Sequence, residues 1–194
     1  RFKCDWSSDV CSSDLVTTPA DMKGFKFRVV GSPLYNETFT ALGANPTQMS
    51  WADAQPALAS GAVDGQENPL SVFVAAKLPS VGQKYLTLWH YVADPLISVV
   101  NKQVWESWTP ADREAVRQAA LQAGRENVEK ARQGIAGADN AVLKQIEASG
   151  VTVTSLSPEQ RDAFVKATRP VYEKWKKSIG SDLVTKAEAD IAKR

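Results

Sequence analysis

The chain has 194 residues, of which 43% are hydrophobic, so it can bury the core of one ordinary domain, or of two lobes if an end of the protein is missing. Its 23 basic and 22 acidic residues give a formal charge of +1, which leaves no basic surplus and argues against nucleic acid as a partner. No apolar run approaches the roughly 18 residues that a membrane-spanning helix needs. We therefore expect a chain that is not itself embedded in a membrane.

Residues 1–15 have an unusual composition, RFKCDWSSDVCSSDL, with neither helical nor strand periodicity. The stretch from Asp5 to Leu15 resembles the in-frame translation of a common sequencing-adapter DNA. We expect residues 1–15 to be a non-native, disordered scar, with a natural disordered N-terminus as the alternative. Cys4 and Cys11 lie in this stretch and therefore indicate nothing about redox compartment. A signal peptide is expected to be lost with the true N-terminus.

Strand and helix patterns alternate from residue 16 to residue 100. A helix start is predicted at Thr18, where Pro19 and Asp21 follow a capping residue. In order, we then expect a strand at 25–30, a helix at 34–42, a strand at 46–50, a helix at 51–60, a strand edge or turn at 62–65, a helix at 69–76 and strands at 86–90 and 95–100, the last one buried on both faces. This alternation predicts an α/β fold with parallel strand pairing.

The period becomes helical after Thr109, where Pro110 and Asp112 form a good helix start. Apolar residues then recur at steps of three and four, which predicts one long helix over 109–149 that spans two bodies. Gly124, Gly134 and Gly137 weaken this helix and could permit a bend. A strand at 151–154, a helix over 157–177 and a final helix over 183–192 are expected to follow.

Signatures of catalysis and of cofactor binding are missing from the sequence. His90 is the only histidine, no Gly-x-Ser-x-Gly motif is present, and there is no dinucleotide fingerprint, P-loop or His/Cys metal cluster. His90 lies between Trp89 and Tyr91, which favours a structural or exposed histidine. We expect no catalytic residues, no cofactor and no metal, and we do not expect an enzyme.

Arg28 is the candidate ligand-binding residue. It lies near the end of the predicted strand 25–30, just before a Gly-Ser-Pro turn, and ligands of open α/β sheets gather at the carboxyl ends of strands. A guanidinium can hold a carboxylate through two parallel hydrogen bonds. From spacing alone, an exposed strand arginine paired with a neighbouring acid is the favoured interpretation.

The segment FKFRVVGSPLYNETFTALGANPTQMSWADAQPALASGAVDGQENPL is similar to the solute-binding proteins of TRAP (tripartite ATP-independent periplasmic) transporters, the DctP-type family. The resemblance rests on the Arg-Val strand followed by Pro, on the Leu-Gly-Ala-x-Pro turn and on the Asp-Gly-x-Glu-Asn-Pro segment. Lys84-Tyr85-Leu86, the strand after Pro95 and the long helix from Thr109 extend it nearly to the C-terminus.

The resemblance implies a periplasmic protein that captures a small organic acid and delivers it to TRAP membrane subunits. Arg28 would form a salt bridge with the substrate carboxylate, Asn68 would give a polar contact, and Trp51 would pack against the ligand. Gln66 and Glu67 would be turn and support residues. The sequence does not identify the acid.

A two-lobed fold with a long lobe-spanning helix is also implied by the resemblance, and the first lobe is expected to be largely missing. Residues 16–93 would form the second lobe, residues 94–134 a first-lobe segment and the start of the spanning helix, and residues 135–194 the return across both lobes. We expect such a fragment to bind poorly by itself and to expose the apolar surface of the missing interface.

Two other classes of protein stay open at this point. The chain could be the ligand-sensing ectodomain of a signalling receptor, because binding lobes are reused in that way. It could also be an α/β enzyme acting on a small acid, with Asp64 or Glu67 as the general base.

Overall fold

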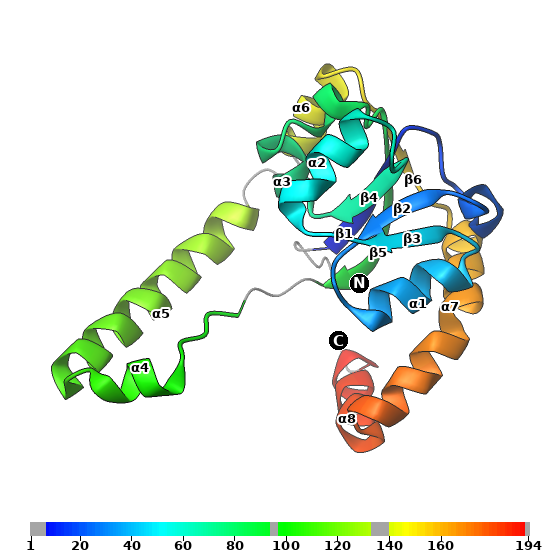
Figure 1. Ribbon diagram of the computed structural model, residues 1–194. Helices are drawn as coiled ribbons and strands as arrows, with labels where there is room; N and C mark the ends of the chain where they lie inside the picture. The colour runs from blue at the N-terminus through cyan, green and yellow to red at the C-terminus, as the bar shows by residue number, and fades with distance from the viewer. Residues whose placement is uncertain (1–6, 94–96, 133–139, 193–194) are drawn as a thin grey trace.

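A computed structural model describes residues 7–93, 97–132 and 140–192 of the chain. A six-stranded sheet in the order β3-β2-β4-β1-β5-β6 forms its centre, and helices cover both faces (Figure 1). The strands are β1 (Ser7–Ser12), β2 (Lys26–Val29), β3 (Asn45–Gln48), β4 (Gly65–Asn68), β5 (Tyr85–Ala93) and β6 (Thr152–Ser155). The helices are η1 (Pro19–Met22), α1 (Pro33–Ala41), α2 (Trp51–Ala59), α3 (Leu70–Ala75), η2 (Leu78–Val81), α4 (Lys102–Ser107), α5 (Pro110–Arg132), α6 (Ala141–Ala148), α7 (Pro158–Ile179) and α8 (Ser181–Ala192).

Parallel pairing joins β2 to β3, β2 to β4 and β5 to β6, as the alternation of strand and helix predicts. Strand β1 runs antiparallel to both β4 and β5, and therefore β5 is parallel to β4. Five of the six strands thus end at the same side of the sheet, which we call the carboxyl edge. The fold class is α/β, as expected.

Two hydrophobic cores lie on opposite faces of the sheet. On the first face, Phe27 stacks on Phe39 of α1 with ring centroids 4.2 Å apart, and Trp89 meets Phe164 of α7 edge-on. On the second face, Leu58, Phe73, Leu86 and Ile146 join α2, α3 and α6 to the sheet. Side chains alternate along β2, so Phe27 and Val29 enter the first core while Arg28 points to the second face.

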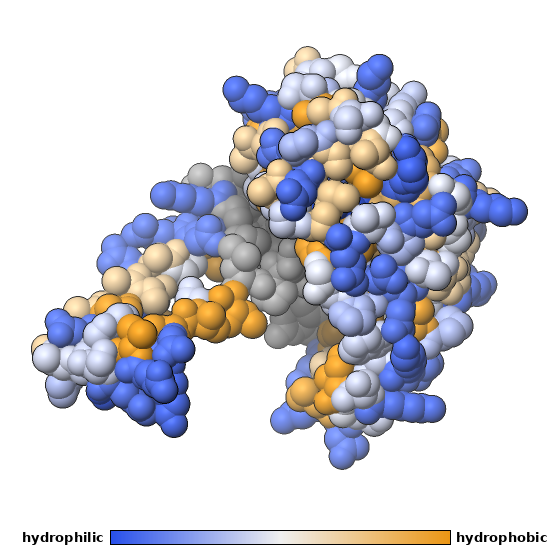
Figure 2. Space-filling model, viewed as in Figure 1, coloured by the Kyte–Doolittle hydropathy of each residue, from blue (hydrophilic) through white to orange (hydrophobic). Residues whose placement is uncertain are grey.

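Residues 97–132, which we call the arm, contain α4 and α5 and extend away from the rest of the chain, which we call the body (Figure 1). Apolar side chains on the arm are exposed: the exposed fraction is 79% for Ile97, 87% for Val99 and 51% for Leu121. Figure 2 shows apolar surface along the arm. The predicted strand at 95–100, buried on both faces, is therefore wrong over 97–100, which are exposed and outside any strand; residues 95–96 lie outside the described residues.

The prediction of one helix over 109–149 is wrong. Helix α5 ends at Arg132, and α6 begins after Asn140, whose φ of 44° belongs to the left-handed region and cannot continue an α-helix. Residues 133–139, which include two of the glycines in the pattern, lie outside the described residues. The helical periodicity is confirmed in α5 and α6, but it did not predict the left-handed conformation of Asn140.

The expectation of a disordered segment over 1–15 is also wrong for residues 7–12. Strand β1 lies inside the sheet, and Val10 and Cys11 have no exposed surface. Its two-sided pairing explains why a polar segment becomes a strand: the neighbours β4 and β5 supply partners for its backbone groups. The non-native origin of residues 5–15 stays a prediction, and residues 1–6 lie outside the described residues.

The remaining predicted elements are confirmed with small shifts at their ends. Thr18 begins η1 with a capping box, and α1, α2, α3, β6, α7 and α8 lie where the pattern places them. The sequence did not predict α4, and it predicted at most the first residue of β4 as a strand edge, because Gln66 and Glu67 were expected to be turn and support residues. Among the described residues, no helix is both long and apolar enough to cross a membrane.

Candidate carboxylate site

Arg28 lies in β2 next to the carboxyl edge and is only 4% exposed. Its Nε and Nη2 atoms donate hydrogen bonds to the carbonyl oxygen of Met49, at 3.2 and 3.1 Å. The Met49 amide in turn donates to the carbonyl of Val29, which ties this acceptor to the end of β2. The guanidinium is thus held in one orientation, and no described residue accepts a hydrogen bond from its Nη1 atom.

Trp51 is brought against Arg28 by the start of α2. Ser50 caps this helix by accepting a hydrogen bond from the Asp53 amide, and Trp51 is its first residue. The Arg28 guanidinium carbon lies 5.5 Å from the centroid of the Trp51 ring, within cation–π distance. The sequence placed both residues in the site, and the structure brings them together.

The charge of Arg28 is set by opposing effects. Burial lowers the pKa of the Arg28 guanidinium, whereas nearby Glu67 and Tyr91 act in the opposite direction. Glu67 is 3% exposed, so a buried carboxylate lies close to the buried cation. An arginine keeps its charge under such conditions, and a charge pair far from bulk water interacts more strongly than one at the surface.

Asn68 ends β4 and is half-buried at the same carboxyl edge. Arg28 is in register with Gln66, so Asn68 lies two residues further along and, like Gln66, on the second face. The Asn68 Nδ2 atom donates a hydrogen bond to Gln66 Oε1. Asn68 is therefore near Arg28 in the sheet, but its side chain is hydrogen-bonded to Gln66.

The role of Met49 and the burial of Gln66 were not predicted. Met49 contributes its backbone carbonyl, a group that every residue has, so its residue type could not indicate this role. Gln66 is completely buried, although glutamine inside a predicted turn suggests the opposite. Its burial could be inferred only from strands on both sides of β4.

A buried carboxylate also occupies the carboxyl edge. Asp9 Oδ1 accepts hydrogen bonds from the Trp89 and His90 amides, at 3.0 and 3.1 Å, where β5 bulges. Burial raises the pKa of Asp9 to about 7, against the lowering effect of these two donors. The His90 Nδ1 atom lies 3.7 Å from Asp9 Oδ1 and its side chain is half exposed; burial first, and then Arg161, lower the pKa of His90.

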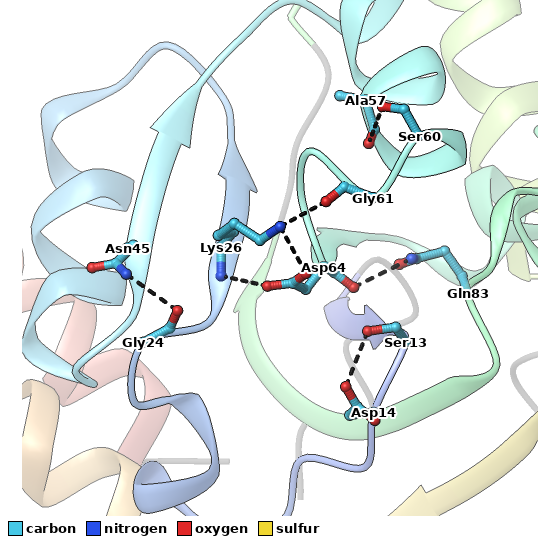
Figure 3. A network of polar contacts seen from close by, with 10 residues as sticks. All are labelled: Ser13, Asp14, Gly24, Lys26, Asn45, Ala57, Ser60, Gly61, Asp64 and Gln83. Carbon is cyan, nitrogen blue, oxygen red and sulfur yellow. Dashed lines mark hydrogen bonds and ion pairs between the residues drawn. The ribbon is translucent and has the colours of Figure 1, made fainter.

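The opposite, amino edge of the sheet carries a separate polar network (Figure 3). Lys26 pairs with Asp64 at 3.3 Å and donates to the Gly61 carbonyl, while Gln83 donates to the Asp64 carbonyl. This network ties β2 to the turn before β4. Asp64 therefore lies at the amino edge, paired with Lys26, whereas Arg28 lies next to the carboxyl edge.

An apolar cavity of about 370 Å³ lies between α1, β5 and α7. Tyr35, Trp89, Tyr91 and Phe164 line it, so it belongs to the first face of the sheet, opposite Trp51. Within the described ranges, His, Cys, Asp and Glu residues form no group of three that could hold a metal ion.

The family model of bacterial extracellular solute-binding proteins, family 7 (DctP), matches residues 9–178. The chain belongs to this family. The C4-dicarboxylate-binding periplasmic protein DctP of Vibrio cholerae is 38% identical over 90% of the chain, and the 2,3-diketo-L-gulonate-binding periplasmic protein YiaO of Escherichia coli is 33% identical over 83%. The chain spans 51% of each, about half the length of these curated relatives.

A solved structure supports the same assignment. A TRAP periplasmic solute-binding protein from Ralstonia eutropha, with bound (S)-2-acetolactate, has a TM-score of 0.93 and 66% identity, covering 97% of this chain and 60% of that one. The α/β fold is thus that of TRAP solute-binding proteins. These relatives are named as binding proteins and not as enzymes.

Proposed function

We propose that the chain is the part of a periplasmic solute-binding protein that holds the carboxylate of a small organic acid for delivery to TRAP membrane subunits. The support is the family match together with the named relatives, which are periplasmic proteins that bind small acids. Arg28, Trp51 and Asn68 are the ligand-contacting residues in this proposal.

The observation that carries the proposal is the fixed guanidinium of Arg28. Two of its donors are already used by the Met49 carbonyl, and Trp51 covers one side. A cation that is oriented before the ligand arrives loses little conformational entropy on binding. Its remaining donors can take a carboxylate at the edge of the sheet where ligands of α/β folds gather.

The ligand class that we propose is a short organic acid with one carboxylate on Arg28 and an apolar part against Trp51. The Ralstonia eutropha protein, with its bound (S)-2-acetolactate, supports this class because two thirds of the aligned residues are identical. Other acids that present a carboxylate to the same arginine are compared in the test.

The test uses a chimera in which residues 16–194 replace the matching part of the Ralstonia eutropha protein, so that the rest of that fold is supplied. Calorimetry measures the affinity for 2-acetolactate, succinate and galactonate. Arg28→Ala is expected to weaken binding by about a hundredfold or more, because it removes the partner of a desolvated charge.

Lys26→Ala is the matched control, because Lys26 lies on the same strand and the same face but pairs with Asp64 at the amino edge. We expect it to leave the affinity within about twofold. An Arg28→Ala chimera that folds and keeps the parental affinity would show that Arg28 does not hold the carboxylate.

A further inference from the structure

Gln66 is a fully buried amide in the middle of the sheet. Its register partners are Arg28 on β2 and Cys11 on β1, so strands enclose it on both sides. A buried amide costs free energy unless its polar atoms are paired, and the described partner on the Nε2 side of Gln66 is the weakly accepting Cys11 thiol, which makes no well-formed hydrogen bond with it. An apolar side chain would fill this position at a lower cost in free energy, so the presence of a glutamine here needs an explanation other than packing.

The other end of this amide faces the site. Gln66 Oε1 accepts a hydrogen bond from Asn68 Nδ2, and the two side chains share a face because they are two residues apart on one strand. One of the two Asn68 N–H groups is therefore taken. No described residue bonds to the Asn68 Oδ1 atom or to its second N–H, so both can meet a ligand at the carboxyl edge.

We propose that Gln66 is a positioning residue that fixes the Asn68 amide, so that the site favours carboxylates bearing a hydroxyl on the neighbouring carbon. The proposal rests on the proposed function, because it concerns the same ligand. A hydroxyl can donate to the Asn68 carbonyl oxygen and accept from its free N–H, whereas a methyl group in its place leaves both unpaired.

Without Gln66, the Asn68 side-chain amide could rotate by half a turn, which exchanges the positions of its oxygen and its nitrogen. The affinity for a ligand that offers only a carboxylate should not change, because the guanidinium that binds the carboxylate is oriented by the Met49 carbonyl and not by Gln66. The Ralstonia eutropha relative was solved with (S)-2-hydroxy-2-methyl-3-oxobutanoate, whose hydroxyl is on the carbon next to the carboxylate.

The experiment compares two acids of nearly equal shape, 2-hydroxy-2-methylpropanoate and 2,2-dimethylpropanoate, in the full 194-residue chain. A ¹⁵N NMR titration in the millimolar range follows the Trp51 indole and Arg28 Nε signals. We expect the hydroxy acid to bind about tenfold more tightly, the effect of roughly one to two hydrogen bonds. In Gln66→Met, this ratio is expected to fall to about twofold or less.

Gln83→Met is the matched control, because Gln83 is also a buried glutamine but bonds to the Asp64 carbonyl at the amino edge. This variant is expected to keep the tenfold ratio. A merely structural role of Gln66 would weaken both acids equally and leave the ratio unchanged, and that result overturns the proposal.

A measurement on the unaltered chain covers the case in which Gln66→Met does not fold. One Asn68 Nδ2 proton should then exchange with solvent at least about tenfold more slowly than those of exposed Asn127, because it is hydrogen-bonded. Equally fast exchange overturns the positioning role.

The proposed function and this inference fail in different ways. If both acids bind equally and Arg28→Ala abolishes the binding of both, Arg28 holds carboxylates but Gln66 selects nothing. If neither acid shifts the Trp51 or Arg28 signals in the isolated chain, the two acids are compared in the chimera; absence of binding there as well refutes both the carboxylate site and its selectivity.

Discussion

The body and the arm are stabilised in different ways, although both contain long helices. In the body, residues far apart in sequence meet: Phe27 of β2, Phe39 of α1 and Phe164 of α7 share one buried core. In the arm, the recorded contacts are local, such as Arg117 with Glu114 and Arg117 over Trp105. The helix ion pair contributes only about 0.2–0.5 kcal/mol and the exposed cation–π contact about 0.5–1 kcal/mol.

The difference teaches where the free energy of folding resides in this chain. Burial of apolar surface is the dominant favourable contribution to folding, and α5 is exposed along nearly its whole described length. The arm therefore depends on helix propensity and local pairs, while the body depends on tertiary packing. Three tests follow, from the largest expected effect to the smallest.

The aromatic core of the body should be most sensitive. Phe27→Ala removes a ring with no exposed surface that stacks on Phe39, and we expect it to lower the free energy of unfolding by about 3–5 kcal/mol. Leu121→Ala in the arm, where the side chain is 51% exposed, should change it by less than about 1 kcal/mol. Urea unfolding followed by circular dichroism measures both; similar losses would contradict the contrast.

The second test concerns Asp9, whose carboxylate bonds to the bulge of β5 from which the chain continues towards the arm. The folded-state pKa of about 7 exceeds the ordinary value of 3.8, so the folded chain binds this proton more tightly than the unfolded chain. Stability from this group is fully present below about pH 4 and is lost as the pH rises to about 7.

Asp9→Asn can keep the acceptor for both amides and never ionises. We expect it to stabilise the chain at pH 8 by about 2–4 kcal/mol, and by about 2 kcal/mol less at pH 5. Urea unfolding at the two pH values gives the difference. An equal gain at both would mean that the ionisation of Asp9 does not limit stability.

Two glycines provide the third test. A Cβ atom at Gly65 in β4 would lie 2.8 Å from the Cys11 carbonyl oxygen and 3.1 Å from the Phe27 ring, so Gly65→Ala should cost about 1–3 kcal/mol. A Cβ at Gly124 in α5 would meet nothing within 4 Å, so Gly124→Ala should strengthen the helix by up to about 1 kcal/mol. Thermal unfolding should show opposite signs; two losses would mean that α5 is packed in solution.

Local patterns were sufficient for elements whose neighbours do not change their preference. The strand at Phe27, the capped start of α7 at Ser157 and the helix beginning at Trp51 were all predicted, because caps, turn residues and periodicity act within a few positions. For the candidate site, Arg28 and Trp51 were predicted together with the family, and their contact is observed. The binding role of Arg28, Trp51 and Asn68 stays a prediction.

Other features depended on neighbours that a local pattern does not encode. The run Ile97-Ser98-Val99-Val100 has the composition of a buried strand, yet residues 97–100 form no strand in the described arm. Strand β1 has the composition of a loop, yet it is central because β4 and β5 pair with it on both sides. Composition indicates the conformation that a segment prefers by itself. In β1, pairing with strands on both sides outweighs that preference.

The sequence by itself determined the α/β class, the parallel alternation of strands and helices, the position of Arg28 near a strand end, and the family. Only the tertiary structure decided that the Met49 carbonyl holds the guanidinium, that Gln66 is buried beside it, and that α5 and α6 are separate helices. The physical reason is that these features are set by contacts between segments 20 or more residues apart, or by one left-handed residue, neither of which leaves a periodic pattern in the chain.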